Sequence, residues 1–365
     1  MEAPFAGAMA FLPSLIEIIV GILLLFGGGE FFVGGSVAIS LRLGIPQIVI
    51  GLTLVSLGTS APELFVSLIS TVQENDGIAI TNIVGSNIFN VLIVLGLSAL
   101  VVPLRVKSRL VRRDVPLLLA ISMAVWGMAA GGRLYWQAGA ALLTALVINI
   151  VWECRTASEN PDEADAFDME ENSTMPVALG KLAAGLVLLV VGSQILVRGA
   201  EAAAALLQIP ETVVGITIVA AGTSMPELVT SVVAAYRGKA DIAIGNVVGS
   251  NIINQLLILG LCAVFSGEGL VAEPILINRD LPIMIATTLA CLPIFWSGGV
   301  IRRREGFVLV ALYGLYLIDQ LIEVVHGGDL LNTFRVAVLV LVVPVVMVFL
   351  AWEVLSWRRQ RKLEG

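Results

Sequence analysis

Long apolar runs separated by short polar or basic segments dominate this chain of 365 residues. A helix crosses a bilayer with about 20 apolar residues, whereas membrane β-barrel strands show shorter segments of alternating polarity. The pattern therefore predicts an all-α integral membrane protein with eleven spans, near residues 13–38, 46–72, 78–102, 115–131, 135–152, 177–206, 211–236, 241–265, 281–297, 307–325 and 336–355.

One polar, acidic segment, residues 153–176, separates the first five predicted spans from the rest. Its acids lack the spacing of a calcium-binding loop, so we interpret it as a solvated cytoplasmic linker rather than a calcium sensor. We expect a first repeat over residues 1–152, a second repeat over 177–325 and an extra C-terminal transmembrane helix over 336–357.

The two sets of five predicted spans repeat one another. GTSAPEL at 58–64 returns as GTSMPEL at 222–228, and GSNIFN at 85–90 returns as GSNIIN, each 164 positions later. The agreement needs no gap from residue 28 to residue 96, which indicates a duplicated unit. Because each unit holds an odd number of spans, we predict two inverted-topology repeats of five helices, with one further helix after them.

The distribution of basic residues predicts the orientation. With the N-terminus outside, most Lys and Arg fall in the inner loops, and the exceptions are Arg133, Arg198, Arg279 and Arg335. We therefore expect an external N-terminus and a cytoplasmic C-terminus. The short linker and the absence of a large regulatory domain favour a prokaryotic plasma (inner) membrane. The lipid bilayer is the expected surrounding, and nothing in the pattern indicates a nucleic-acid partner or an obligate protein partner.

Two carboxylates stand inside otherwise uncharged spans. Glu63 is the only charged residue between Leu43 and Val72, and Glu227 is the only one between Thr212 and Tyr236. Placing a charge at the centre of a membrane helix costs about 2.5 kcal/mol or more. These acids are therefore candidates for function rather than a structural polar pair.

Oxygen-bearing side chains surround both acids. Pro62 lacks an N–H for the carbonyl of Gly58, so we expect an interrupted helix with available carbonyl oxygens. Hydroxyls three and four positions from each acid share its side of the helix, and the neighbouring motifs place a Ser and an Asn on one face. The resulting candidates are Thr59, Ser60, Ser67, Thr223, Ser224, Ser231, Ser86, Asn90, Ser250 and Asn254, with Asn82 and Asn246 as either ligands or interhelical hydrogen-bonding residues.

Carboxylate, amide, hydroxyl and carbonyl oxygens suit hard cations such as Ca²⁺ or Na⁺ and do not suit zinc, copper or iron. Two facing carboxylates repel unless cations or protons balance them. One Ca²⁺, two Na⁺ or two H⁺ would each do so, and such alternative occupants are what exchange requires. No cofactor is expected, and the charge argument leaves the counter-ion open.

The paired motifs resemble the two alpha repeats of the cation/calcium exchanger superfamily, in particular its sodium/calcium exchanger branch. The resemblance covers residues 28–100 and 192–264. It implies that Glu63 and Glu227 are the central ligands and that helices 13–38 and 177–206 slide against the remaining repeat helices. It further implies ligand roles for Thr59, Ser60, Ser86, Asn90, Thr223, Ser224, Ser250 and Asn254, with backbone carbonyls near Ser56 and Ala220.

One departure concerns Asn90 and Asn254, because some members carry Asp at one of these positions. The predicted function is exchange of Ca²⁺ for Na⁺. The alternative is a proton- or potassium-coupled exchanger, and a passive cation channel is a less favoured one. An enzyme is not expected, since Ser60 and Ser224 lack a His or Lys base. Glu30 and Glu201 are placed near the mouths, where they either attract cations or snorkel.

Overall fold

The computed structural model describes residues 3–363 apart from 75, 160–173, 208, 210–213, 215, 216, 218, 219, 297, 298, 326 and 327. Most of the predicted linker and the beginning of the predicted span 211–236 therefore lie outside the described residues. The described part is predominantly helical, and several helices contain short π-helical segments, labelled η.

The first half of the chain forms one very long helix, then a set of broken or π-bulged helices, and finally a second long helix. Its elements are α1 (Ala3–Leu43), α2 (Gln47–Ile50), η1 (Gly51–Val55), α3 (Ser56–Thr59), α4 (Ala61–Val72), α5 (Asp76–Phe89), η2 (Asn90–Leu95), α6 (Gly96–Val101), β1 (Leu104–Arg105), η3 (Leu110–Asp114), α7 (Val115–Ala129), β2 (Arg133–Leu134) and α8 (Trp136–Glu159).

The second half follows the same order and adds a helical segment at its end. Its elements are α9 (Met175–Leu206), α11 (Ala220–Thr223), α12 (Met225–Tyr236), α13 (Ala240–Ile253), η6 (Asn254–Ile258), α14 (Leu259–Phe265), β3 (Leu270–Val271), η7 (Leu276–Asp280), α15 (Leu281–Trp296), β4 (Val300–Ile301), α16 (Arg303–Val325), α17 (Gly328–Ala337), η8 (Val338–Val342) and α18 (Val343–Leu363).

Within the described residues, eight helices are long and apolar enough to cross a membrane, or nine if the bent pair Gln47–Thr59 and Ala61–Val72 is one span. The predicted span 115–131 corresponds to α7, which has only 15 residues by itself. Eleven spans therefore stay a prediction. The predicted fifth span, 135–152, agrees with the apolar stretch Trp136–Glu153, and the helix α8 itself continues to Glu159.

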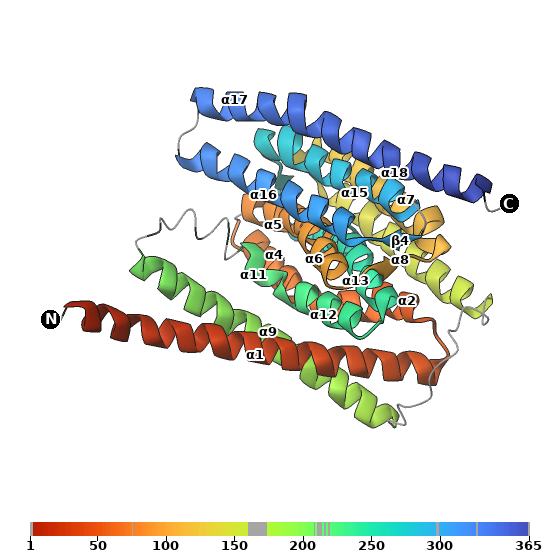
Figure 1. Ribbon diagram of the computed structural model, residues 1–365, viewed down its shortest axis with the longest axis horizontal. Coiled ribbons are helices and arrows are strands. Elements are labelled where there is room, and N and C mark those ends of the chain that lie inside the picture. Colours follow the sequence, from red (N-terminus) through yellow and green to blue (C-terminus); the bar gives the residue numbers. More distant parts are fainter. Residues whose placement is uncertain are drawn as a thin grey trace.

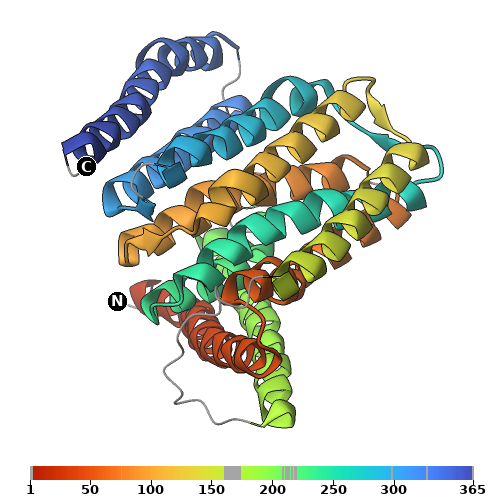
Figure 2. The same ribbon diagram turned by 90° about the vertical axis from the view of Figure 1, so that its right-hand side faces the viewer.

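The helices α1 and α9 cross each other on one side of the bundle (Figures 1 and 2). They run antiparallel, since Gly21 lies beside Leu196 and Gly35 lies beside Leu182. The crossing is lined by glycines at intervals of seven residues on both helices, namely Gly21, Gly28, Gly35, Gly185, Gly192 and Gly199. Small residues at such crossings let membrane helices pack closely in the absence of a hydrophobic driving force.

The two halves of the chain interlock in the rest of the bundle. The first-half helix α8 packs on α14, and the second-half helix α16 packs on α6. Two short antiparallel ladders, which the all-α prediction did not contain, join the same regions: β1 pairs with β4, and β2 pairs with β3. These contacts fix the relative positions of the two motif-bearing regions at the centre.

The segment α17–α18 lies along the edge opposite α1 and α9 (Figures 1 and 2). Ion pairs connect it to α16 near both ends. Arg335 Nε of α17 is 2.8 Å from Asp319 Oδ1, and Glu353 Oε1 of α18 is 2.6 Å from Arg304 Nη2. The C-terminal segment is therefore docked against the bundle.

Candidate cation-binding site

Glu63 and Glu227 occupy equivalent positions, each in the first turn of a helix that begins after a break. The break at Ser60 separates α3 from α4 and bends the pair by 47°. It follows from Pro62, which cannot continue the hydrogen-bonding pattern of the preceding turn. Ser224 precedes α12 with similar backbone angles, φ −90° and ψ 9°. The expected interruption of the helix at this motif is thus confirmed by the structure.

Both carboxylates are completely buried, with 0% exposure. Among the described residues, no Lys, Arg or His forms an ion pair with either of them. A buried charge without a partner is strongly unfavourable. The pair of acids therefore requires bound cations or protons to balance it.

The carboxylates are tied across the two halves by serine hydroxyls. Ser60 Oγ donates to Glu227 Oε1 at 3.0 Å, and Ser224 Oγ donates to Glu63 Oε1 at 2.8 Å. Each acid is thus supported by the serine that precedes the opposite acid. Helical spacing predicts Ser60 on the side of Glu63, and the structure shows that its hydroxyl reaches across to Glu227.

The asparagines of the second motif are joined in the same crossed manner. Asn90 Nδ2 donates to Asn251 Oδ1 at 3.1 Å, and Asn254 Nδ2 donates to Asn87 Oδ1 at 3.1 Å. Asn90 and Asn254 each begin a π-helical segment, η2 and η6. Such π-bulges are frequent at functional sites because they reorient side chains within a helix.

Several buried oxygen atoms of these motifs have no hydrogen-bond partner within the described part of the chain. Three pairs of them lie 164 positions apart: Oε2 of Glu63 and Glu227, Oγ of Ser86 and Ser250, and Oδ1 of Asn90 and Asn254. Thr223 Oγ1 belongs to the same class. Buried polar atoms are normally satisfied. This set of acceptor oxygens therefore fits a hard cation as the missing partner.

Other predicted residues have protein partners instead. Thr59 Oγ1 donates to Asn246 Oδ1 at 3.1 Å, and Ser56 Oγ donates to the carbonyl of Gly51 at 2.5 Å. Asn82 Nδ2 donates to Ser67 Oγ, and Asn246 Nδ2 donates to Ser231 Oγ, both at 3.0 Å. Asn82 and Asn246 thus hold neighbouring helices together. Ala220 begins α11, two residues before Gly222 of the GTSMPEL motif.

Asn87 and Asn251 had no assigned role in the sequence-based prediction. Both are buried, and both contact Asn90 or Asn254, whose oxygens lack a hydrogen-bond partner among the described residues. Their signal was present in the sequence, because they too are repeated at the offset of 164.

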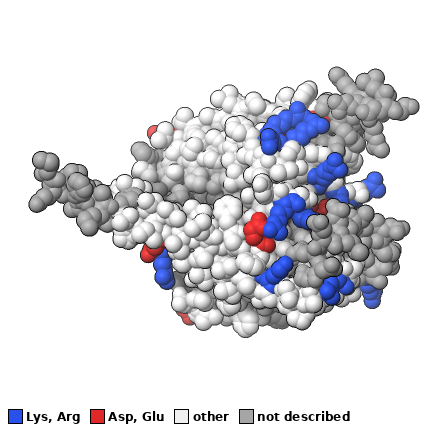
Figure 3. All heavy atoms as spheres, turned by 60° about the horizontal axis from the view of Figure 1, so that its bottom comes forward, with Lys and Arg blue, Asp and Glu red and all other residues white. Residues whose placement is uncertain are grey.

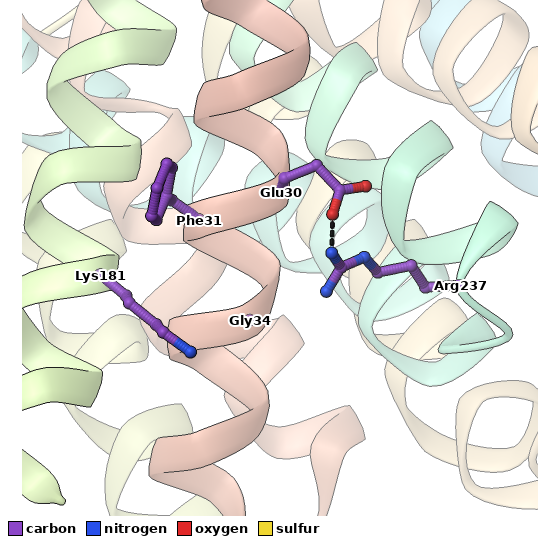
Figure 4. A pocket seen from close by; sticks show the side chains of 5 residues that line it. All are labelled: Glu30, Phe31, Gly34, Lys181 and Arg237. Carbon is purple, nitrogen blue, oxygen red and sulfur yellow. Dashed lines mark ion pairs between the residues drawn. The ribbon is translucent and has the colours of Figure 1, made fainter. Parts of the chain in front are cut away.

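A separate pocket lies between α1, α9 and α12, and the predicted site residues do not line it (Figure 4). Its lining residues are Glu30, Phe31, Gly34, Lys181 and Arg237. Glu30 forms an ion pair with Arg237, which connects α1 to the end of α12. Glu30 is therefore engaged with a cationic side chain of the protein.

Comparison with known proteins identifies related sequences and folds. The profile of a family described as sodium/calcium exchanger protein matches residues 13–154 and 177–322. The sodium/calcium exchanger MaX1 of Methanosarcina acetivorans is 34% identical over 343 residues, covering 84% of this chain and 97% of that protein. The inner membrane protein YrbG of Escherichia coli is 33% identical over 287 residues, covering 76% and 87%. A structure of the sodium-calcium exchanger NCX_Mj soaked with Na⁺ and Sr²⁺ superposes with a TM-score of 0.73 at 30% identity, covering 84% of this chain and 98% of that one.

Proposed function

This chain belongs to the sodium/calcium exchanger family and is a cation/Ca²⁺ antiporter of the membrane, and we propose that it exchanges Ca²⁺ for Na⁺. The relatives named as exchangers support this choice of counter-ion. Alternating access to one central site, occupied in turn by Ca²⁺ and Na⁺, would carry out the exchange.

The observation that carries this proposal is the set of central oxygens that recur in both halves of the chain and have no hydrogen-bond partner among the described residues. Two carboxylates balance one Ca²⁺, and the neutral oxygens complete a coordination shell of the kind that Ca²⁺ and Na⁺ accept. We assign the ligand roles to the residues of both motifs, with backbone carbonyls near Ser56 and Ala220. The side chains are Glu63, Glu227, Thr59, Ser60, Ser86, Asn90, Thr223, Ser224, Ser250 and Asn254.

We further propose ten helices in two inverted repeats plus the C-terminal helix. The described chain begins and ends at opposite ends of the bundle, as an odd number of spans requires (Figure 1). Most of the visible Lys and Arg gather toward one end of the molecule (Figure 3), which supports a cytoplasmic location for that end and for the C-terminus. The similarity to an inner membrane protein supports the same membrane for this chain.

The test uses the full-length protein in vesicles loaded with Ca²⁺. Gradients of Na⁺, K⁺ and H⁺ are imposed one at a time, and Ca²⁺ efflux is followed. We expect efflux with the inward Na⁺ gradient and little with the others. Efflux driven only by H⁺ or K⁺ would show that this ion, and not Na⁺, is the counter-ion. Efflux without any counter-ion gradient would indicate a channel.

A further inference from the structure

The four asparagines at the centre form two hydrogen-bonded pairs between the halves of the chain. Asn87 and Asn254 form one pair, and Asn90 and Asn251 form the other. All four side chains are at most 1% exposed. In each pair, the residue that begins a π-helical segment uses its Nδ2 as the donor and keeps Oδ1 without a partner among the described residues.

A side-chain amide has an acceptor at one end and a donor at the other, so its two orientations have opposite effects on a cation. If Asn90 were turned over, its NH₂ group would face the site and its oxygen would oppose Asn251 Oδ1. Both changes are unfavourable when a cation is bound. The oxygen of Asn251 therefore selects the orientation in which Asn90 presents an oxygen.

Asn251 and Asn87, the residues that select these orientations, are themselves held by hydrogen bonds of different strength. Asn251 Nδ2 donates to the backbone carbonyl of Asn87 at 3.2 Å, whereas Asn87 Nδ2 donates to the sulfur of Met284 at 3.5 Å. A backbone carbonyl is a strong acceptor and a thioether is a weak one. The orientation of Asn251 is thus fixed more firmly than that of Asn87.

We propose that Asn87 and Asn251 are positioning residues that orient the amides of Asn254 and Asn90 toward the transported cation, an inference that rests on the proposed function. Neither residue needs to touch the ion. Each one acts on a ligand contributed by the other half of the chain, so cation binding depends on correct alignment of α5 with α13.

The first measurement is the Kd for ⁴⁵Ca²⁺ of the full-length protein in detergent. Leu has nearly the shape of Asn without its polar atoms. We expect Asn251→Leu to weaken binding by about 10- to 100-fold, as is typical when a group that orients a metal ligand is removed. Asn87→Leu should weaken it less, because its orienting contact is the less firmly held one.

A double-mutant cycle separates orientation from a general structural effect. If Asn251 acts through Asn90, adding Asn251→Leu to Asn90→Ala should change Kd by less than about threefold. Asn87→Leu is the matched control, because it acts on Asn254 and its effect should multiply with that of Asn90→Ala. The proposal would be overturned if the fold-changes in Kd caused by Asn251→Leu and Asn90→Ala multiplied in the double variant. It would also be overturned if Asn251→Leu left Kd unchanged.

Folding is checked by size-exclusion chromatography and by thermal unfolding without Ca²⁺. If Asn251→Leu does not fold, Asn251→Ala takes its place in the cycle.

Asn251→Asp is the conservative variant, since its carboxylate still accepts from Asn90 Nδ2, and it should bind Ca²⁺ more tightly than the apolar variants. Equal binding by all of them would contradict orientation by the acceptor oxygen. Failure of the unmodified protein to bind Ca²⁺ would instead refute the proposed function, and this inference with it.

Discussion

The region around Glu63 and the region around Glu227 agree at the centre and differ immediately outside it. The crossed serine bonds, the crossed asparagine bonds and six central oxygens without a hydrogen-bond partner among the described residues occur in matched pairs. The supporting contacts do not. Thr59 donates to Asn246, whereas Thr223 Oγ1 has no hydrogen-bond partner within the described chain. The two sides of the site therefore present matched ligands, although the hydrogen bonds that hold the surrounding side chains differ.

A second difference concerns the contacts that connect α1 and α9 to the other helices. Glu30 of α1 is paired with Arg237 at the end of α12. The residues 164 positions away, Gln194 of α9 and Gln73 at the end of α4, are neutral. The ion pair is thus present at only one of the two pairs of positions that the repeat makes equivalent. Two states that open to opposite sides would therefore differ in free energy, and one of them would be more populated than the other.

The largest expected effect follows from removing either central charge. Glu63→Gln and Glu227→Gln should each weaken Ca²⁺ binding by more than about 100-fold, because leaving one charge of a buried set unbalanced costs about 3–5 kcal/mol. Equilibrium ⁴⁵Ca²⁺ binding and exchange in vesicles check this, with membrane insertion unchanged. Retained exchange in one variant would show that only one half carries the site.

An intermediate effect is expected from the crossed serines. Ser60→Ala and Ser224→Ala each remove a hydrogen bond to a carboxylate, which contributes about 1.5–3 kcal/mol, or about 10- to 150-fold in Kd. The two losses should be similar, because the bonds are 3.0 and 2.8 Å long. Ser122→Ala is the control, since buried Ser122 donates only to Leu118 of its own helix. A large loss in one variant alone would break the equivalence of the two sides.

The smallest effect is expected at the one-sided ion pair. Glu30 and Arg237 are 41% and 42% exposed, so solvent and salt screen the pair to about 1 kcal/mol or less. Glu30→Gln with Arg237→Gln should change the exchange rate by no more than about fivefold, less at high salt. Gln194→Glu with Gln73→Arg introduces charges at the equivalent positions and should act on the opposite direction of transport. Identical effects of both double variants on both directions would mean that neither pair biases the cycle.

Much of this arrangement could be predicted from the repeat, and its contacts could not. The offset of 164 identifies Ser60 with Ser224 and Asn87 with Asn251. It reports equivalence between positions, and contact between them depends on how the halves interlock. Helical spacing predicts that Ser60 shares the side of Glu63, and only the structure shows that its hydroxyl donates to Glu227. The thickness of a bilayer predicts a first span that ends near residue 38, whereas α1 continues to Leu43, before Gly44 at φ +63°.

The glycines at the crossing of α1 and α9 restrict how this protein can change in evolution. A Cβ atom at Gly21, Gly28, Gly35, Gly192 or Gly199 would lie 2.6–2.9 Å from atoms of the facing helix, and at each position at least one of these atoms is main-chain. A clash with a side chain is relieved by a smaller neighbour, but a clash with the main chain has no compensating substitution. These positions cannot drift individually, and the crossing can diverge among descendants only if both helices move apart together.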